Sequence, residues 1–229
     1  MPVYNEGENI SQQIYDLEKK LKMQFEILIV YDFEEDDTVG VVKTIRKKFK
    51  NIRIIKNLGR GVIGAVKTGI YRSDGMVIVV MPADLADDPQ TINKMYKKMA
   101  EGYDIVSATR YGNGGKKIGG AFLKTQLSRI AGIFTPLLLG IPITDISNGF
   151  KMYREEVLKK IKIESTGGWE FSCEIIIKAH HAGFRIGEVA TVWRDRIKGK
   201  SKFKLLKWLP KYLKWYGYGM LLRLNINRR

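Results

Sequence analysis

Cysteine is almost absent from this sequence, and long apolar runs are absent altogether. Cys173 is the only cysteine in 229 residues, so an intrachain disulfide and a cysteine-built metal site are both excluded. A protein with a single thiol suits a reducing compartment. We expect Cys173 itself to be a small buried hydrophobic residue. No apolar run reaches the roughly 18 residues of a membrane span, and the N-terminus lacks the basic-then-apolar pattern of a signal peptide. We therefore expect neither a membrane-spanning helix nor secretion.

Acidic residues are scarce relative to basic ones: 24 Asp and Glu accompany 40 Lys and Arg, a formal net charge of +16. This excess indicates a polyanionic partner, such as nucleic acid, anionic lipid or a phosphorylated substrate. It is concentrated in residues 194–229, where twelve basic residues accompany one acid. A nucleic-acid-binding surface would instead spread its basic residues over a face with stacking aromatics. We expect no nucleic-acid partner, because the charge lies in one tail beside leucines and tryptophans.

The length and the 45% apolar content are those of one globular domain with an appendage, which we place at 1–200 and 201–229. Up to residue 110, β-rich runs alternate with stretches of helical period. The runs are 25–30, 52–55, 77–81 and 104–108, and the helical stretches are 8–22, 38–49, 62–72 and 90–100. This alternation predicts a doubly wound, mostly parallel α/β sheet, which binds ligands at the carboxyl ends of its strands.

An apolar segment at 118–143 interrupts the alternation. Lys124, Arg129, Pro136 and Pro142 divide it, so it is too short and too broken to cross a bilayer. Two interpretations remain open: a core helix followed by a loop, or a helix that lies against a membrane or lipid. Beyond this segment we expect a strand at 150–153, a helix at 169–181 and a strand at 186–193.

A glycine pattern, G-x-G-x-x-G, runs from Gly59 to Gly64 between an expected strand and an expected helix. It is typical of a dinucleotide site. However, it belongs to the third strand–helix unit rather than the first, and the acid downstream, Asp84, follows Pro82 beyond the strand end. These two features argue against a dinucleotide site. We still expect the helix N-terminus beside Arg60 to be able to bind a phosphate.

Candidate ligand-binding residues, most of them polar, follow three of the expected strands and should meet at one edge of the sheet. Asp84 lies too early to cap the helix that Pro89 begins, so its carboxylate is a candidate ligand for a divalent ion that neutralises a diphosphate. For Asp87 and Asp88, helix capping is the favoured interpretation. The full set at this edge is Pro2, Tyr4, Glu6, Asp32 and Asp84.

Seven segments together resemble one known family. They are MPVYNEGENI (1–10), NLGRGVIGAVKTGI (57–70), MPADLADDP (81–89), SATRY (107–111), the segment 145–157, GWEF (168–171) and DRIKGKSKF (195–203). In this order they resemble the inverting glycosyltransferases of family 2, and within them the dolichyl-phosphate or polyprenyl-phosphate mannose and glucose synthases. The resemblance implies a GT-A fold, a nucleotide-diphosphate sugar as donor, a Mg or Mn ion, and a polyprenyl phosphate as acceptor.

Residue by residue, the resemblance also implies roles. The resemblance places Pro2, Tyr4 and Glu6 at the nucleotide and Asp32 near the base. Arg60, from its place at a helix N-terminus, and Asp84 complete the expected donor-binding set. The last acid of the D-x-D metal motif falls on Asp84. The acceptor-phosphate positions are Arg110, Lys124, Ser128, Arg196 and Lys202. Asp84, Arg110 and Arg196 are the expected catalytic residues.

Some of these positions have plainer interpretations, which remain open. Lys124 is alternatively a solvated lysine, and Ser128 an ordinary helix residue. Glu170 and Glu174 lie four residues apart on one helix face, and either points at the donor sugar or pairs with a lysine.

Other positions depart from the family's pattern. Tyr31 and Pro82 stand where relatives carry acids, and Ala86 lacks an oxygen that some relatives direct at the metal. We therefore expect weaker metal affinity, although Asp84, the donor diphosphate and water can complete an octahedral ion. The first strand is also expected to hold about six apolar residues before Pro2. The sequence has only one residue there, so either the chain has been shortened or its start codon has been assigned too late.

The function expected from the resemblance is hexose transfer, with inversion, from a nucleotide-diphosphate sugar to dolichyl or another polyprenyl phosphate at the cytoplasmic membrane face. A phosphate monoester is already ionised near neutral pH, so this nucleophile needs no dedicated general base. The acids missing at Tyr31 and Pro82 motivate an alternative: a catalytically weak relative that serves as a membrane-associated binding or scaffold protein.

The basic tail has the pattern of an amphipathic helix that lies on an anionic membrane surface. Trp208 and Trp215, seven residues apart, share a stripe that favours the headgroup level. Pro210 kinks or splits the helix. An ordinary helix packed on the domain remains the alternative. The cationic face is formed by Lys204, Lys207, Lys211 and Lys214.

Overall fold

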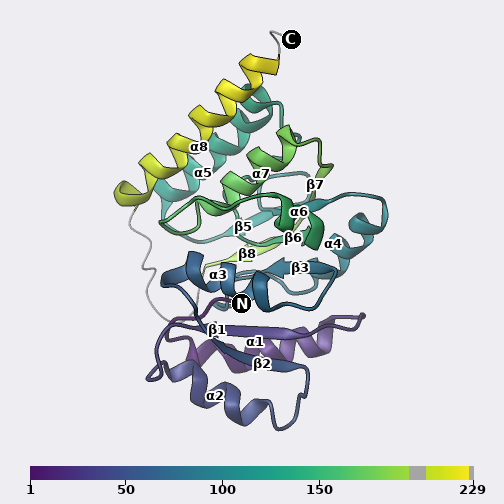
Figure 1. Ribbon diagram of the computed structural model, residues 1–229, viewed down its shortest axis with the longest axis vertical. Helices are drawn as coiled ribbons and strands as arrows, with labels where there is room; N and C mark the ends of the chain where they lie inside the picture. The colour runs from purple at the N-terminus through teal and green to yellow at the C-terminus, as the bar shows by residue number, and fades with distance from the viewer. Residues whose placement is uncertain (196–204, 227–229) are drawn as a thin grey trace.

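The computed structural model describes residues 1–195 and 205–226, an α/β fold whose strands form three sheets (Figure 1). β1 (Ile27–Tyr31) and β2 (Ile52–Lys56) pair in parallel. The next sheet has the order β3 (Val77–Val80), β6 (Lys151–Arg154), β4 (Ile105–Thr109) and β7 (Ile186–Ala190). β5 (Lys116–Ile118) and β8 (Val192–Arg194) form the third.

The helices follow the expected alternation with the strands. They are α1 (Gly7–Lys20), α2 (Asp37–Ile45), α3 (Gly61–Arg72), α4 (Thr91–Ala100), α5 (Phe122–Phe134), the π-helical turn η1 (Thr135–Leu139), α6 (Glu155–Lys160), α7 (Phe171–His181) and α8 (Leu205–Ile226). The predicted parallel pairing is confirmed for β1 with β2 and for β4 with β7. One strand departs from it: β6 runs antiparallel to both of its neighbours, β3 and β4.

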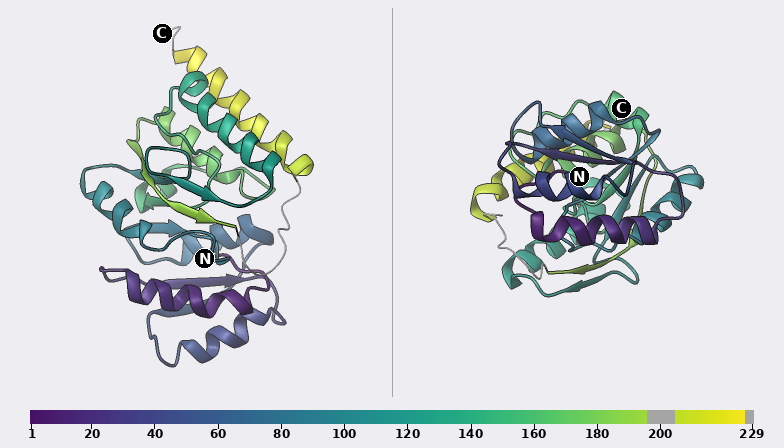
Figure 2. Two further views of the ribbon diagram at one scale, coloured as in Figure 1. Left: turned by 180° about the vertical axis from the view of Figure 1, so that it is seen from behind. Right: turned by 90° about the horizontal axis from the view of Figure 1, so that it is seen from below.

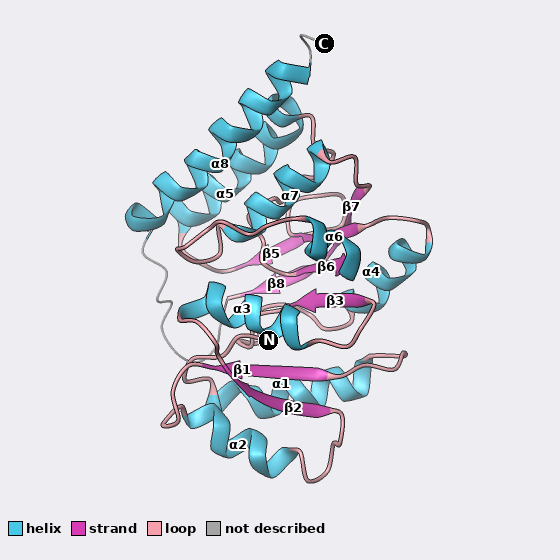
Figure 3. Ribbon diagram, viewed as in Figure 1, coloured by secondary structure: helices cyan, strands magenta, loops and turns pink. Residues whose placement is uncertain are grey.

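Two apolar clusters fill the interior on either side of the sheets. One packs α1 and α2 against β1 and includes Ile14, Ile29 and Val42. The other packs α7 against β3 and β6 and includes Ile176 and Tyr153. Figure 3 shows the two regions, with α1 and α2 at one end of the molecule and α5, α7 and α8 at the other. The lone cysteine, Cys173, lies in the second cluster as expected, and burial raises the pKa of its thiol to about 12.

The apolar segment 118–143 is not the core helix that one interpretation predicted. Of the residues in α5, only Gly132 is buried. Several large apolar side chains of α5 and η1 are instead exposed: Phe122, Leu123, Ile130, Ile133, Phe134 and Leu137. Gly132 is buried because the backbone of the next loop crosses α5 at this point. A Cβ atom at Gly132 would collide with the carbonyl oxygen of Thr144.

Replacing Gly132 should therefore destabilise the protein. We expect Gly132→Ala to lower the free energy of unfolding by about 1–3 kcal/mol, because the helix or the Thr144 loop must move to admit the methyl group. Gly217→Ala is the matched control: Gly217 lies in α8, and a Cβ atom added there would meet no atom within 4 Å, so the better helix propensity of alanine should stabilise by about 0.5–1 kcal/mol. Urea unfolding of both variants measures the difference, and equal effects would contradict this interpretation of Gly132.

The C-terminal helix packs on the domain through Trp215, which corrects the prediction that this residue lies at the level of lipid headgroups. Trp215 is buried in the second apolar cluster, and its Nε1–H donates to Ser165 Oγ at 2.9 Å. The hydroxyl group of Tyr216 donates to the carbonyl oxygen of Ala131 in α5 at 2.9 Å. Pro210 does not split the helix, which is continuous over 22 residues. Lys204 lies outside the described residues.

The exposed side of α8 carries leucines. Leu213, Leu221 and Leu224 are exposed, and Lys214 is exposed beside them. Figure 2 shows α5 and α8 side by side on the same flank of the molecule. Among the described residues, no helix is both long and apolar enough to span a bilayer.

Candidate functional site

The loop before α1 is held in place by the start of α2. The backbone N–H of Glu6 donates to Thr38 Oγ1 at 2.9 Å, and the N–H of Asn5 donates to the buried carboxylate of Asp36 at 3.1 Å. Asn5 has a φ of 52°, a left-handed conformation that is uncommon outside glycine. This loop presents Tyr4, which is half exposed and packs edge-on against Phe33 with 5.4 Å between ring centroids.

Asp32, directly after β1, binds the start of α3. Its Oδ2 accepts the backbone N–H of Gly61 at 2.8 Å, and its Oδ1 accepts Asn57 Nδ2 at 2.5 Å. A carboxylate of the chain itself therefore occupies the helix N-terminus that the glycine pattern led us to expect for a phosphate. Gly61 has a φ of 63°, which explains the glycine at this turn. Arg60 precedes it and is exposed.

Asp84 follows β3 in a strained turn. Its Oδ1 accepts the backbone N–H of Ala86 at 3.2 Å, and the residue between them, Leu85, has a φ of 61°. A branched side chain in the left-handed region costs free energy and persists only where the surroundings enforce it, which is common at functional sites. The turn holds the half-buried Asp84 carboxyl at the carboxyl end of the strand, where the sequence predicted it.

Asp87 is not the helix cap that the sequence favoured. It pairs with Trp193 in an isolated β-bridge, and its side chain is buried with Oδ1 lacking a hydrogen-bond partner. Burial first, and then the nearby Asp84 carboxylate, raise the pKa of Asp87 to about 7. Asp88 does match the capping prediction, because its Oδ1 accepts the backbone N–H of Gln90 at 3.1 Å.

The raised pKa of Asp87 makes stability depend on pH. The folded protein holds this proton up to about pH 7, whereas the unfolded chain releases it near pH 3.8. The unfolding free energy should therefore fall as pH rises from about 4 to about 7 and then level off. Asp87→Asn should remove this fall and make the protein more stable than wild type at pH 8, as measured by urea unfolding with EDTA present. Asp88→Asn is the control, and an identical pH dependence in wild type and Asp87→Asn would refute the assignment.

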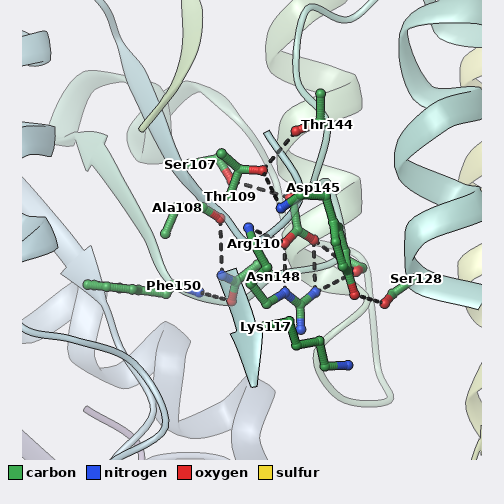
Figure 4. A network of polar contacts seen from close by, with 12 residues as sticks. Ser107, Ala108, Thr109, Arg110, Lys117, Ser128, Thr144, Asp145, Asn148 and Phe150 are labelled. Carbon is green, nitrogen blue, oxygen red and sulfur yellow. Dashed lines mark hydrogen bonds and ion pairs between the residues drawn. The ribbon is translucent and has the colours of Figure 1, made fainter. Parts of the chain in front are cut away.

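A buried ion pair joins the end of β4 to the loop before β6. Arg110 Nε donates to Asp145 Oδ2 at 2.7 Å, and Nη2 donates to Oδ1 at 2.8 Å, so the pair is bidentate (Figure 4). Although burial alone would lower it, the Asp145 carboxylate raises the pKa of Arg110. Nη2 also donates to Ser147 Oγ at 3.2 Å. The guanidinium predicted to hold an acceptor phosphate thus has two of its three nitrogens engaged by the protein.

The other predicted acceptor residues lie close to Arg110. Ser128 Oγ bonds to the hydroxyl group of Tyr111, and Arg110 lies 5.2 Å from the centroid of that ring. Lys124 has interactions within the protein and is close enough to lower the pKa of Lys117. Burial is the main cause of that shift, followed by Arg110, and together they bring the pKa of Lys117 to about 8. Arg196 and Lys202 lie outside the described residues.

Glu170 and Glu174 bind the protein rather than facing the sheet edge. Glu170 accepts the backbone N–H groups of Gly167 and Gly168 at 2.9 and 2.6 Å. Glu174 accepts Lys178 Nζ at 2.6 Å, which confirms the plainer of the two interpretations. Both carboxylates hold the loop before α7 against that helix.

The predicted residues therefore form two groups. Tyr4, Glu6, Asp32 and Arg60 surround the ends of β1 and β2. The charges of Asp84, Arg110 and Asp145 all shift the pKa of Asp87. These four residues therefore form one charged cluster at the ends of β3 and β4. Pro2 pairs with Val30 of β1 and connects to the first group through the loop that follows it.

The acidic part of this cluster suits a cation. In the described residues, no three His, Cys, Asp or Glu side chains gather as a ready-made metal site. Asp84 and Asp87 nevertheless offer carboxylate oxygens, the ligands that Mg²⁺ and Mn²⁺ prefer, and the unpartnered Asp87 Oδ1 is buried. A nearby positive ion would compensate a buried oxygen that the protein leaves without a donor.

Sequence reasoning missed Asp87, Asp145 and Lys117. Asp145 begins one of the segments that carry the family resemblance, so a signal for it was present. Asp87 stands beside Asp88 immediately before a proline, and local sequence does not show which of two adjacent acids caps the helix. That difference arises from the pairing with β8, more than 100 residues away.

The chain is similar to known proteins over most of its length. The chain is 28% identical over 228 residues to a dolichol-phosphate mannosyltransferase of Pyrococcus furiosus, a match that covers 95% of this chain and 63% of the relative. It is 26% identical over 225 residues to a polyprenol monophosphomannose synthase of Mycolicibacterium smegmatis, covering 91% and 84%. The chain thus spans somewhat less than two thirds of the Pyrococcus relative's length.

Solved structures show the same fold. Glucosyl-3-phosphoglycerate synthase of Mycobacterium tuberculosis, in complex with Mn²⁺, UDP-glucose and phosphoglyceric acid, superposes with a TM-score of 0.70 at 16% identity, covering 96% of this chain and 77% of that one. This likeness confirms the predicted GT-A fold. The family model for glycosyl transferase family 2 matches residues 1–162. The chain therefore belongs to glycosyl transferase family 2.

Proposed function

We propose that this protein transfers a hexose, with inversion, from a nucleotide-diphosphate sugar to dolichyl or another polyprenyl phosphate at the cytoplasmic face of a membrane. The observation that carries the proposal is the charged cluster, in which the buried Asp87 lies near Asp84 after β3 and near Arg110 at the end of β4, whose guanidinium is paired with Asp145. On this proposal, Asp84 and Asp87 would take a cation-neutralised diphosphate, and Arg110 would take an acceptor phosphate. The names of two relatives, a dolichol-phosphate mannosyltransferase and a polyprenol monophosphomannose synthase, point to the same acceptor.

The donor nucleotide would bind over the ends of β1 and β2. The half-exposed Tyr4, with the partly buried Phe33 against its ring, offers an aromatic side chain for stacking, and the Asp32–Asn57 contact fixes the turn that follows β1. Pro2 and Glu6 would set the position of that loop, and the exposed Arg60 would approach the diphosphate. Asp84 would hold a divalent cation with help from Asp87, and the ion, when bound, would neutralise diphosphate charge.

The acceptor phosphate would bind beside Arg110. Because Asp145 holds two guanidinium nitrogens, Arg110 presents its remaining edge in a fixed orientation, and Lys117 and Lys124 add positive charge around it. Ser128, Arg196 and Lys202 remain proposed contributors. The acceptor oxygen is ionised near neutral pH, so these residues serve to align it with the anomeric carbon rather than to remove a proton.

A transfer assay tests the proposal directly. Purified protein is incubated with a panel of UDP- and GDP-linked hexoses, a detergent-solubilised polyprenyl phosphate, and MnCl₂ or EDTA. We expect polyprenyl-phosphate hexose to form from one donor and only with the cation. Donor binding by calorimetry without turnover of any donor would instead favour the alternative, a catalytically weak relative that acts as a scaffold.

The lipid acceptor is consistent with an apolar surface formed by α5, η1 and α8. Arg223 Nη1 donates to the carbonyl oxygen of Leu137 at 2.6 Å, which brings the end of α8 next to η1. On this surface, cations stand beside apolar residues, as in helices that lie in a bilayer interface. Its exposed apolar members are Phe122, Leu123, Ile130, Ile133, Phe134, Leu137, Leu213, Leu221 and Leu224, and its basic members are Arg129, Lys214 and Arg223.

Vesicle sedimentation tests this surface. We expect the protein to sediment with anionic but not with neutral vesicles, and about 0.5 M salt to release much of it by screening. The double variant Leu137→Glu/Leu221→Glu should lower partitioning at least about tenfold, since each leucine loses favourable burial in the interface. Deleting α8 would be a poorer test, because the deletion would also remove the buried Trp215.

Tyr71→Glu is the matched control for the double variant. Tyr71 is 74% exposed on α3, outside the α5–α8 surface, so the same added charge there should leave sedimentation close to wild type. If both variants sediment equally, the α5–α8 surface is not the membrane contact.

A further inference from the structure

A fully buried lysine is bonded to the loop that begins with Asp145. Lys151, the first residue of β6, is 0% exposed and forms no ion pair with any residue that the structure describes. Its Nζ instead donates to the carbonyl oxygen of Ile146 at 3.0 Å, to the carbonyl oxygen of Asn148, and to Ser172 Oγ at 2.6 Å. An ammonium group has three N–H donors, so these three oxygens use all of them.

A buried ammonium without a bonded carboxylate is costly, because burial disfavours the charged form. Burial is the main cause that lowers the pKa of Lys151 to about 8. Methionine would fill a similar volume without that cost, so packing alone does not account for a lysine here. The titratable groups around the ammonium are Cys173 of α7, Asp145 of the loop, Arg110 after β4, Asp87 after β3 and Glu188 of β7.

The loop bonded to Lys151 carries the partner of Arg110. Asp145 accepts both guanidinium bonds and also the backbone N–H of Arg110, the last at 3.1 Å. Asn148 ties the same loop to β4, because its Nδ2 donates to the carbonyl oxygen of Ala108 at 3.0 Å (Figure 4). The bonds from Lys151 to two carbonyl groups of this loop therefore act on the segment that sets the orientation of the guanidinium.

We propose that Lys151 is a positioning residue for the acceptor site, whose charged ammonium holds the 145–148 loop in the arrangement that directs Arg110 toward the acceptor phosphate. This inference rests on the proposed function, which assigns that phosphate to Arg110. A neutral amine has only two N–H donors and turns a lone pair toward the oxygens, so at least one of the three bonds is lost. The loop should therefore loosen as pH rises through about 8.

Steady-state kinetics of Lys151→Met test this role. Methionine bonds to none of the three oxygens, so KM for undecaprenyl phosphate should rise at least about tenfold. The Kd for GDP-mannose or UDP-glucose, whichever turns over, should stay within about twofold of wild type, because the donor binds at other strand ends.

Lys178→Met is the matched control for this variant. Lys178 is also mostly buried and donates to the carbonyl oxygen of Lys162 at 2.8 Å, but its carboxylate partners are Glu164 and Glu174 rather than the 145–148 loop. The control should lose stability without a change in KM for undecaprenyl phosphate. An unchanged KM in Lys151→Met, or an equal rise in both variants, would show a merely structural role and overturn the proposal.

Hydrogen exchange of the wild-type protein tests the loop without turnover and without a variant that must fold. The amides of Arg110 and Phe150 both donate to side chains of the loop, at 3.1 Å in each case. Between about pH 7 and about pH 9, we expect their protection to fall at least about tenfold relative to the Ile27 amide of β1. The pKa of Lys117 is also about 8, and Lys117→Met should leave this fall in place.

The two proposals fail in different ways. If protection at Arg110 and Phe150 follows that at Ile27, or if Lys117→Met abolishes the fall, the proposal for Lys151 is wrong even where transfer occurs. Absence of transfer from every donor would instead overturn the proposed function, even where exchange shows that Lys151 controls the loop.

Discussion

Asp145→Asn should lower the free energy of unfolding by about 3–5 kcal/mol, one of the two largest effects we expect from a single substitution. Asp145 is fully buried and holds Arg110 through two side-chain bonds of 2.7 and 2.8 Å. Asparagine keeps the shape and one acceptor oxygen, but it leaves the arginine charge buried without a counter-charge. The loss comes chiefly from that uncompensated charge, because an intact buried pair gains little over apolar residues of similar size.

A second substitution separates charge from packing. Arg110→Met in the Asp145→Asn background removes the stranded charge. The introduced asparagine still offers a side-chain oxygen to the backbone N–H at position 110, which donates to Asp145 at 3.1 Å in the wild type. The double variant should therefore recover most of the lost stability in urea unfolding. If it is no more stable than Asp145→Asn alone, the pair does not act through its charge.

The sequence predicted the strand–helix alternation well because each unit carries its own local signal. The helical stretch 62–72 became α3 over Gly61–Arg72, and the run 77–81 became β3 over Val77–Val80. The hydrophobic periodicity of a strand says less about which strands it pairs with and in which direction. Nothing in the composition of β6 reveals that it runs antiparallel between β3 and β4, because this depends on the path of the long connection before it.

The sequence allowed us to predict which candidate site residues follow the end of a single strand. Asp84 lies where a strand end and the family resemblance both placed it. Contacts between residues distant in sequence were not predictable. Asp145 pairs with the guanidinium of Arg110, Asp32 accepts a hydrogen bond from the N-terminus of α3, and Asp87 forms a β-bridge with β8. Each of these contacts joins residues at least 29 positions apart, which local patterns do not encode.

The same limit applies to the tail. Amphipathic spacing correctly indicated a helix with one apolar side, but it did not show which side meets the domain. Trp215 and its hydrogen bond to Ser165 decide this, and the remaining leucines with those of α5 form the exposed surface. The tryptophans and the leucines both recur at helical spacing, so only packing shows which of them meet the domain.

The other large effect is expected at Asp84. On the proposed function, Asp84→Ala should weaken donor binding in the presence of MnCl₂ by more than about 100-fold, equal to about 2.8 kcal/mol. Asp84 is the remaining acid of the metal motif, since Pro82 stands at the other acidic position, and the strained turn at Leu85 fixes its carboxyl. Without it, Asp87 is the only carboxylate of that pair left to hold the cation.

Calorimetry with the nucleotide-diphosphate sugar, with MnCl₂ and then with EDTA, measures this effect. The variant should bind the donor equally weakly under both conditions, whereas wild type should lose affinity only with EDTA. Asp88→Asn is the matched control, because Asp88 bonds to the Gln90 N–H and to Lys20, and asparagine caps as well as aspartate. If Asp84→Ala retains cation-dependent binding, or if Asp88→Asn loses as much, the cation site does not lie at Asp84, and the assignment of the diphosphate to the end of β3 fails with it.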